Sequence, residues 1–328
     1  MKETRVLLVG GGSGGHVYPL VAVARALQEK ASVQGINLKL MMLGSGNFFE
    51  RAAKENNLPF KQITAGKFRR YFSFASLADP FKLLVSFIQS FWYLFLFMPD
   101  TVFTKGGYVS IAPSIIAWLY LIPVYIHETD SVSGLANKII SKFAKKIFIS
   151  FRDSVKYFNP SKTILTGNPV RKELGQGDKN SAMQYFGFKQ PRPTILILGG
   201  SQGAMVINDV VVSGLLALSQ KLNIIHQCGD GQYDSVKAAT DTMAVQNYRL
   251  YSFLDENQLS LGYALADVIV SRAGGLLFEI AQVGKPAIVI PILNSPGNHQ
   301  YLNASEFSSY GGRLIEEPEF DQGRLIST

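Results

Sequence analysis

Two glycine-rich segments, each lying between an apolar run and a helical pattern, constrain the fold of this chain more than any other feature. Residues 10–15 follow the apolar run 6–9 and precede a helical pattern at 20–27, and residues 199–203 follow the apolar run 194–198 and precede a helical pattern at about 204–218. Glycine adopts positive φ and lets a ligand approach the backbone, and the N-terminus of a following helix attracts phosphate. Each segment therefore predicts a strand, a loop and a helix that open an α/β domain. A tight turn without a ligand is the alternative.

The rest of the chain continues this alternation of short apolar strands and helical patterns. Because strands that alternate with helices form parallel sheets covered on both faces, the pattern predicts two doubly wound domains. A length of 328 residues also corresponds to about two domains. Asn168-Pro169 breaks regular structure, so we place the domains at residues 1–167 and 168–328. The further expected strands lie at residues 39–43, 102–103, 124–127, 147–150, 223–227, 249–253, 268–271 and 287–291.

Charge is distributed unevenly between the two halves. Residues 1–168 contain 20 Lys and Arg against 9 Asp and Glu, whereas the remaining residues contain 12 against 15. A basic domain joined to a weakly acidic one suggests that a polyanionic surface, either nucleic acid or anionic lipid, meets the first domain alone. The single cysteine, Cys228, excludes a disulfide framework, and the N-terminal residues carry no secretory signal, so a cytoplasmic protein is expected.

An aromatic, apolar stretch at residues 67–98 helps to decide between these surfaces. Residues 83–98 carry no charge, and this run is shorter than the roughly 20 apolar residues of a membrane-spanning helix. It fits either a buried crossover helix or an amphipathic helix in a membrane interface. Aromatics crowded on an apolar helix do not form the basic, aromatic platform that binds nucleic acid. The basic residues that precede the run are Lys67, Arg69, Arg70 and Lys82.

The few histidines suggest proton chemistry and not metal binding. His16 lies in the first glycine-rich segment, where an imidazole of near-neutral pKa can exchange protons. His127 follows a predicted strand and is expected to be structural, and His226 is expected to pack inside the second domain. The sequence has no spacing of His and Cys typical of a metal site, so no metal is expected. No acidic residue closes the strand at 39–43, which argues against a nicotinamide dinucleotide.

Seven motifs occur in one order along nearly the whole chain. They lie at residues 11–17, 105–110, 127–130, 134–138, 167–171, 199–204 and 271–274. On these motifs the sequence resembles the MurG family of glycosyltransferases, which add N-acetylglucosamine to lipid I and so form lipid II in peptidoglycan synthesis. The resemblance implies the GT-B architecture, in which two Rossmann-like domains face each other across a cleft. It also implies an inverting transfer from UDP-N-acetylglucosamine, which the second domain would hold.

The resemblance further implies the residues that bind the donor. Arg171 and Ser201 would contact the diphosphate, Glu279 would accept both ribose hydroxyls, and the backbone of Leu254 would meet the uracil. Asp130 occupies a position near the sugar where the family usually has asparagine, and an aspartate accepts hydrogen bonds but donates none. The donor-binding residues implied in full are Ser13, Gly14, Gly15, Asp130, Arg171, Ser201, Leu254, Glu279 and Gln300.

The implied chemistry needs a base but no metal ion or other cofactor. His16 is the first candidate to take the proton of the acceptor 4-hydroxyl, and Glu128 is the second. The first domain would take lipid I from an anionic membrane surface, as a peripheral protein on the cytoplasmic face of the cell membrane, with no nucleic acid partner. The alternatives are another membrane-associated GT-B nucleotide-sugar transferase and a nucleotide-sugar-binding homologue with weak catalysis.

Two departures from the family pattern concern the second domain. The segment 272–279 is one residue shorter than in the family, so its ribose and phosphate contacts are expected to differ in geometry. The family pattern also continues for some tens of residues beyond residue 328, with helices that return to the first domain, so the sequence represents either an abbreviated enzyme or an incomplete one.

Overall fold

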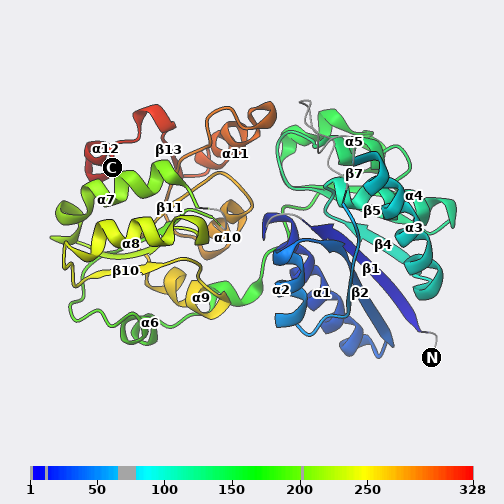
Figure 1. Ribbon diagram of the computed structural model, residues 1–328, viewed down its shortest axis with the longest axis horizontal. Coiled ribbons are helices and arrows are strands. Elements are labelled where there is room, and N and C mark those ends of the chain that lie inside the picture. The colour runs from blue at the N-terminus through cyan, green and yellow to red at the C-terminus, as the bar shows by residue number, and fades with distance from the viewer. Residues whose placement is uncertain (1–2, 12–13, 66–78, 201–202, 328) are drawn as a thin grey trace. The chain divides into compact units, whose positions relative to one another are not determined.

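The computed structural model of the chain forms two compact α/β units (Figure 1). The first unit ends at Arg171 and the second begins at Lys172. The boundary predicted from the sequence placed residues 168–171 in the second domain, whereas the structure places them in the first unit. Each unit contains one parallel sheet, which confirms the predicted pair of doubly wound α/β domains. The structure describes residues 3–11, 14–65, 79–200 and 203–327.

The first unit is built on a seven-stranded sheet in the order β3-β2-β1-β4-β5-β6-β7. All neighbouring strands in it are parallel, so they need crossover connections. The chain winds outward in one direction from β1 and in the other from β4, which places the switch point between these two strands. The strands are β1 Thr4–Gly11, β2 Leu38–Ser45, β3 Phe60–Gln62, β4 Thr101–Thr104, β5 Val124–Glu128, β6 Lys146–Ile149 and β7 Thr163–Leu165.

Helices cover both faces of this sheet. Leu7 and Val9 of β1 belong to the core under α3, α4 and α5, while Val6 and Leu8 belong to the core under α1 and α2. Successive residues of a strand point to opposite faces, so a strand buried on both sides is apolar throughout. The helices are α1 Gly14–Gln34, α2 Asn47–Glu55, α3 Asp79–Phe97, η2 Tyr108–Ser110, α4 Ile111–Leu119, α5 Leu135–Ile140, η3 Arg152–Tyr157 and η4 Pro160–Lys162.

Helix α1 begins earlier than the sequence pattern predicted. The apolar pattern indicated a helix from about Leu20, but the helix begins at Gly14, so His16 lies in its first turn and Pro19 inside it. The first N–H groups of a helix have no partner within the helix, so glycine is tolerated there. Gly11 has a separate role, because a Cβ at this position would lie 2.6 Å from the carbonyl oxygen of Ser45 in β2.

The second unit repeats the strand order around its own switch point. Its six-stranded parallel sheet has the order β10-β9-β8-β11-β12-β13, which matches the first six strands of the first unit in sequence. The switch point lies between β8 and β11, where the second glycine-rich segment follows β8. The strands are β8 Thr194–Leu198, β9 Asn223–Gln227, β10 Tyr248–Tyr251, β11 Val268–Ser271, β12 Ala287–Val289 and β13 Arg313–Leu314.

The core of the second unit also lies on both faces of its sheet. Leu196 and Leu198 of β8 belong to the core under α6, α9 and α10, and Ile195 and Ile197 belong to the core under α7 and α12. The helices are η5 Lys172–Gly175, α6 Lys179–Phe186, α7 Met205–Ser219, η6 Asp230–Gln232, α8 Tyr233–Asp241, α9 Glu256–Leu265, α10 Leu276–Val283, η7 Pro296–Asn298, α11 His299–Ser308, η8 Glu317–Glu319 and α12 Gln322–Ser327.

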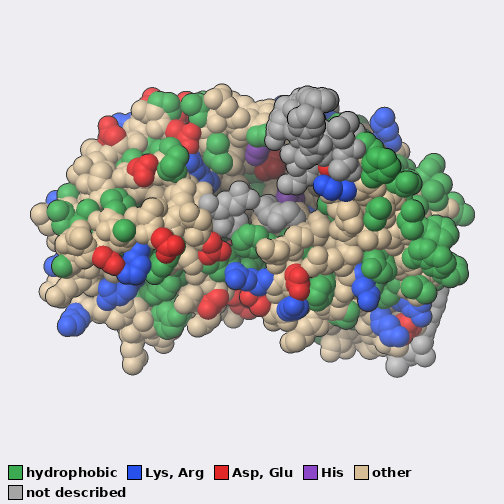
Figure 2. All heavy atoms as spheres, in the orientation of Figure 1, with side chains coloured by type: hydrophobic (Ala, Val, Ile, Leu, Met, Phe, Trp, Pro, Cys, Tyr) green, Lys and Arg blue, Asp and Glu red, His purple; other side chains and the backbone are tan. Residues whose placement is uncertain are grey.

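Helix α3 is a crossover helix that buries one narrow stripe. Ser86, Ser90 and Leu94 are buried, and α3 packs against α4. Figure 2 shows hydrophobic side chains gathered on the surface over these two helices. The exposed face of α3, called here the α3 surface, consists of Phe81, Leu84, Val85, Ile88, Phe91, Trp92, Phe95 and Leu96. The helix therefore combines the two interpretations that the sequence left open, because one side is core and the other is apolar and exposed.

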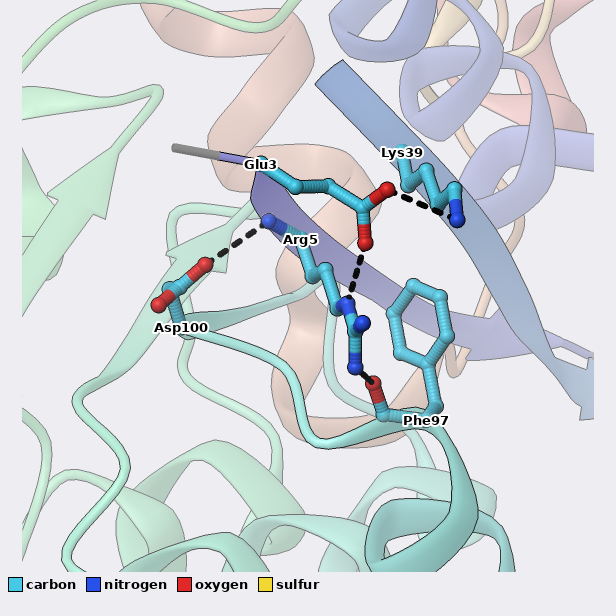
Figure 3. A network of polar contacts seen from close by, with 5 residues as sticks. All are labelled: Glu3, Arg5, Lys39, Phe97 and Asp100. Carbon is cyan, nitrogen blue, oxygen red and sulfur yellow. Dashed lines mark hydrogen bonds and ion pairs between the residues drawn. The ribbon is translucent and has the colours of Figure 1, made fainter. Parts of the chain in front are cut away.

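A polar network anchors the C-terminal end of α3 to the sheet (Figure 3). The guanidinium of Arg5 in β1 donates to the carbonyl oxygen of Phe97 at 3.0 Å, and the backbone N–H of Arg5 donates to Asp100 at 2.8 Å. Glu3 lies between Arg5 and Lys39, and hydrogen bonds from Lys39 and Arg5 lower the pKa of Glu3. Phe97 packs partly against the core and lies outside the α3 surface.

Among the described residues, α3 is also the one helix whose length and apolar composition would allow it to cross a membrane. Most of its length is not buried in the first unit. However, α3 connects β3 to β4 along the chain, and Leu94 lies in the core with residues of β1 and β4. A helix held in this way lies along the sheet and keeps one face on it.

Candidate functional site

The first candidate site lies at the carboxyl edge of the first sheet, beside its switch point. The residues that follow β1, β4, β5 and β7 all emerge at this edge, because the strands are parallel. Ligands of open α/β sheets bind in this position. The segments concerned are 14–16 at the start of α1, 105–107 after β4, 127–130 at the end of β5 and 167–168 after β7. Most of the sequence motifs of the first half therefore meet at one edge.

Lys105 joins three of these segments although it is fully buried. Its Nζ lies 2.7 Å from Nδ1 of His127 and 2.7 Å from Oδ1 of Asn168. Nε2 of His127 lies 2.8 Å from the carbonyl oxygen of Gly167. An ammonium group only donates, so Nδ1 accepts and Nε2 carries the hydrogen. Burial lowers the pKa of Lys105 to about 7, although the negative charges of Glu128 and Asp130 act to raise it.

The two histidines of this edge differ in their surroundings. His127 is buried, and burial together with the charge of Lys105 holds its pKa well below the usual value. The charge of His16 also contributes to this lowering of the His127 pKa, so the two rings are electrostatically linked. His16 is half-buried in the first turn of α1. His127 is therefore a neutral structural group, as expected, while His16 keeps access to solvent.

Glu128 braces the loop that follows β5. Its carboxylate is buried and accepts hydrogen bonds from the backbone N–H of Asp130 at 3.2 Å and of Gly134 at 3.1 Å. The side-chain amide of Asn137 donates to it at 3.0 Å. Burial raises the pKa of Glu128, and Asp130 adds to that effect. Three donors thus occupy the carboxylate that the sequence offered as the second candidate base.

Gly106 and Gly107 shape the turn after β4. Both have positive φ, +80° and +79°, and a Cβ on Gly106 would lie 2.2 Å from Oδ1 of Asn137. The backbone N–H of Gly106 donates to Oγ1 of Thr104 at 3.0 Å. Only glycine fits this turn beside α5, because any side chain would displace Asn137 and with it the contact to Glu128.

Arg171 belongs to the first unit and packs against α1. Its guanidinium lies 4.5 Å from the centre of the Tyr18 ring, and the residue is 5% exposed. An arginine over an aromatic face is held by a cation–π contact. Gly14 is buried and Gly15 exposed at the start of the same helix. Ser13 and Ser201, two other expected donor-binding residues, lie outside the described residues.

The second candidate site lies at the carboxyl edge of the second sheet. Gln227, the last residue of β9, donates from Nε2 to the carbonyl oxygen of Gly200 at 3.3 Å and accepts the N–H of Leu254 on Oε1 at 2.9 Å. It thereby ties the loop after β8 to the loop after β10. Leu254 is buried, and the predicted contact of its backbone with uracil stays a prediction. Sequence analysis did not single out Gln227, whose signal is an amide at the end of an apolar strand.

Two further expected donor residues lie on α10 and α11. Glu279 is buried in the first turn of α10, where the hydroxyl of Tyr263 donates to its Oε2 at 3.4 Å. It is therefore not a solvated surface glutamate. Oε1 of Gln300 accepts the backbone N–H of Ile292 at 3.0 Å, and the backbone N–H of Gln300 donates to Oγ of Ser295 at 3.1 Å.

An ion pair that the sequence did not predict joins the segment after β11 to η8 at this edge. Nη2 of Arg272, which follows β11, lies 2.6 Å from Oε1 of Glu317, and Glu317 also accepts the N–H of Leu293 at 2.9 Å. The pair borders a cavity of about 720 Å³ lined by residues 291–298 with Tyr301, Glu316 and Glu317. Among the described residues, no three His, Cys, Asp or Glu side chains gather as metal ligands would.

His226 confirms its expected packing role in the second unit. It is fully buried in β9, with Nε2 3.0 Å from Oδ1 of Asn208 and Nδ1 2.9 Å from the hydroxyl of Tyr248. Burial lowers the pKa of His226 to about 3. The ring is therefore neutral at physiological pH.

Comparison with known proteins agrees with this architecture. Residues 6–149 match the glycosyltransferase family 28 N-terminal domain, and residues 194–328 match the glycosyltransferase family 28 C-terminal domain. A UDP-N-acetylglucosamine–N-acetylmuramyl-(pentapeptide) pyrophosphoryl-undecaprenol N-acetylglucosamine transferase of Clostridium perfringens is 35% identical over 100% of this chain and 90% of its own length. A Bacillus anthracis transferase of the same name, numbered 2, is 36% identical over 95% of this chain and 87% of its own.

Solved structures give the same picture. MurG of Acinetobacter baumannii has a TM-score of 0.69 and 27% identity, over 99% of this chain and 89% of its own. A UDP-GlcNAc 2-epimerase of Neisseria meningitidis bound to UDP-GlcNAc also has a TM-score of 0.69, with 15% identity over 99% of this chain and 90% of its own. This second likeness concerns the fold alone.

Proposed function

The chain belongs to glycosyltransferase family 28, and we propose that it transfers N-acetylglucosamine from UDP-N-acetylglucosamine to lipid I, forming lipid II for peptidoglycan synthesis. The observation that carries this proposal is the 35% identity, over the whole chain, to a transferase named for that reaction. The lipid I acceptor is an N-acetylmuramyl-pentapeptide on undecaprenyl pyrophosphate, and its 4-hydroxyl receives the sugar with inversion at the anomeric carbon.

The second unit is proposed to hold the donor nucleotide. The loop after β8, including Ser201, would present backbone N–H groups to the diphosphate at the start of α7. Glu279 would accept both ribose hydroxyls, since a buried carboxylate has acceptor capacity beyond its contact with Tyr263. Leu254 would meet the uracil through its backbone, and Gln300 would meet the donor from the start of α11. Gln227 supports this arrangement, because it joins the two loops that carry Gly200 and Leu254.

The first unit is proposed to supply the base. His16 is half-buried, and imidazole is the side chain best suited to remove a proton at physiological pH. It would take the proton of the acceptor 4-hydroxyl while that oxygen attacks the anomeric carbon and UDP departs. Glu128 is the weaker candidate, because three donors already occupy its carboxylate. Ser13, Gly14, Gly15, Asp130 and Arg171 are proposed to line the sugar and phosphate groups.

The α3 surface is proposed to dock on an anionic membrane, so that the protein is peripheral to the cytoplasmic face. Its exposed residues recur at intervals of three and four, which aligns them along one side of the helix. An apolar helix face beside basic residues is the usual form of an interfacial anchor. The excess of 20 Lys and Arg over 9 Asp and Glu in residues 1–168 supplies attraction to anionic lipid.

The proposed reaction is tested by measuring UDP release with purified protein and a lipid I analogue. We expect turnover with UDP-N-acetylglucosamine and little with UDP-glucose, and we expect no UDP release when the acceptor is omitted. Binding of UDP should raise the thermal stability of the protein, since a ligand of the native state stabilises it. UDP binding without any transfer to lipid I would favour a nucleotide-sugar-binding homologue, and preference for another donor would favour a different transferase.

A further inference from the structure

Lys105 connects the ends of three strands through its side-chain hydrogen bonds. It follows β4, binds His127 at the end of β5, and binds Asn168 after β7. His127 in turn donates to the carbonyl oxygen of Gly167, the neighbour of Asn168. One ammonium group therefore sets the relative positions of three segments at the edge where the candidate base lies. The function proposed above gives this lysine no role.

Packing alone does not explain a lysine at this position. The side chain is 1% exposed, and desolvation disfavours its charged form. An apolar side chain of similar length would fill the space without that cost. A neutral amine would still donate both hydrogen bonds, since it keeps two N–H groups. What the proton adds is a positive charge, which the negative charges of Glu128 and Asp130 favour.

The groups around Lys105 come from the end of β5, the loop beyond it and the segment after β7. Glu128 and Asp130 are the charged groups that favour its proton, and the neutral ring of His127 touches its amine. Asn168 provides a polar but uncharged contact after β7. His16 on α1 acts on the same cluster through its effect on His127. Loss of the lysine charge would leave Glu128 and Asp130 without this buried counter-charge.

We propose that Lys105 is a positioning residue of the transferase, whose charged ammonium holds the loops after β5 and β7 in the arrangement that serves acceptor transfer. The first loop depends on an ionised Glu128, which accepts from Asp130, Gly134 and Asn137. The loop after β7 continues through segment 167–171 to Arg171, which packs on Tyr18 of α1. Helix α1 also carries His16, so the loop after β7 is connected through Arg171 and Tyr18 to the helix of the candidate base. This inference rests on the proposed function.

The test compares two neutral variants, a charged variant and a matched control. Lys105→Met removes the charge and both hydrogen bonds, and Lys105→Gln removes the charge while keeping polar contacts. Lys105→Arg keeps the charge, because a guanidinium stays protonated at every pH that proteins tolerate. Lys145→Met removes an exposed lysine of the same unit and serves as the control. We measure kcat/KM for the lipid I analogue from pH 5.5 to 9, the Kd of UDP, and hydrogen–deuterium exchange of segments 129–134 and 166–168.

We expect both neutral variants to lower kcat/KM for the acceptor at least tenfold at pH 6.5 and to leave the Kd of UDP within twofold. The kcat/KM of the wild type should decrease as the pH rises through the lysine pKa of about 7. That fall should be absent from the neutral variants and moved above pH 9 in Lys105→Arg. Exchange of segments 129–134 and 166–168 should become faster in the neutral variants, and Lys145→Met should match the wild type throughout.

Three results overturn the inference. One is wild-type kcat/KM and wild-type exchange in the neutral variants. Another is a loss of activity that leaves the alkaline fall unchanged, because the lysine would then act by shape and not by charge. The third applies if the wild-type protein itself shows no transfer, so that the proposed function fails. Hydrogen–deuterium exchange then tests the positioning role by itself, and unchanged exchange in both neutral variants rejects it. If only one of the two neutral variants folds, kcat/KM and exchange are compared between the wild type and that variant.

Discussion

Replacing Trp92 and Phe95 of the α3 surface by serine should weaken binding to anionic vesicles without unfolding the first unit. The two side chains are 54% and 53% exposed, and their ring contacts are with each other and with Phe91 on the same helix, so the variant leaves the buried stripe of α3 intact. An aromatic side chain carries about 150–250 Å² of surface, which leaves roughly 200 Å² of the pair available to lipid. At about 25 cal/mol per Å² this area is worth at most about 5 kcal/mol on insertion. Partial insertion reduces this value, and we expect at least a tenfold loss of affinity.

The assay is co-sedimentation with vesicles of phosphatidylglycerol and phosphatidylcholine at low and high salt. Charge attraction is screened beyond about 3 Å at 1 M salt, whereas inserted rings are not affected in this way. The wild type should therefore bind less at 1 M salt but still measurably. The variant should keep the binding that is seen at low salt and is screened by salt, and it should lose the binding that the wild type retains at 1 M salt.

The matched control is Met205→Ser with Leu216→Ser on α7 of the second unit. These side chains are 64% and 57% exposed, so the control removes similarly exposed apolar groups outside the proposed docking face. It should bind vesicles like the wild type. The reasoning is refuted if the α3 variant binds as the wild type does in high salt, if the α7 control loses as much affinity, or if the α3 variant unfolds.

Three further predictions concern single residues. His16→Ala should lower kcat by about 10²–10⁴, the usual contribution of general base catalysis, with little change in UDP affinity, and near-full activity would exclude this base. Glu279→Gln should weaken UDP binding more than pyrophosphate binding in calorimetry, and equal losses would remove the ribose contact. The pKa of Lys105 is about 7 in the folded protein, below the ordinary lysine value of 10.5, so the unfolded chain binds the extra proton between these values. Denaturant titrations should show wild-type stability rising with pH across that window relative to Lys105→Met, by an amount on the order of 5 kcal/mol, and parallel pH curves would contradict the shift.

Local pattern was sufficient to predict the parallel strands and the glycine-rich loop that opens each domain. The runs 6–9 and 194–198 are apolar without interruption, which is typical of strands buried on both faces, and they became β1 and β8. The glycines after them indicated where each domain begins, and the common strand order confirms two similar halves. The carboxyl ends of parallel strands meet at one edge, which explains why motifs of the first half that are far apart in sequence lie together in the structure.

Other features depend on packing that local pattern does not contain. Helix α3 is apolar on both its buried and its exposed side, so periodicity left open which side faces the sheet. The small side chains of Ser86 and Ser90 let the helix approach its neighbours, although polar residues usually indicate a solvent-facing stripe. Similarly, the start of α1 was placed too late, because Gly14 precedes the apolar pattern from which the helix was predicted.

Lys105 shows why the most constrained charge of the first unit was absent from the sequence-based site. A lysine between a strand and two glycines is typical of a solvated loop, and no local signal marks it as buried. Its partners lie 22 and 63 residues further along the chain, and they reach it only when β5 and β7 take their places in the sheet. Burial of an ammonium group costs stability at neutral pH, so its presence needs a compensating interaction. The carboxylates of Glu128 and Asp130 supply that interaction, and the loop they belong to leads to the proposed sugar contact.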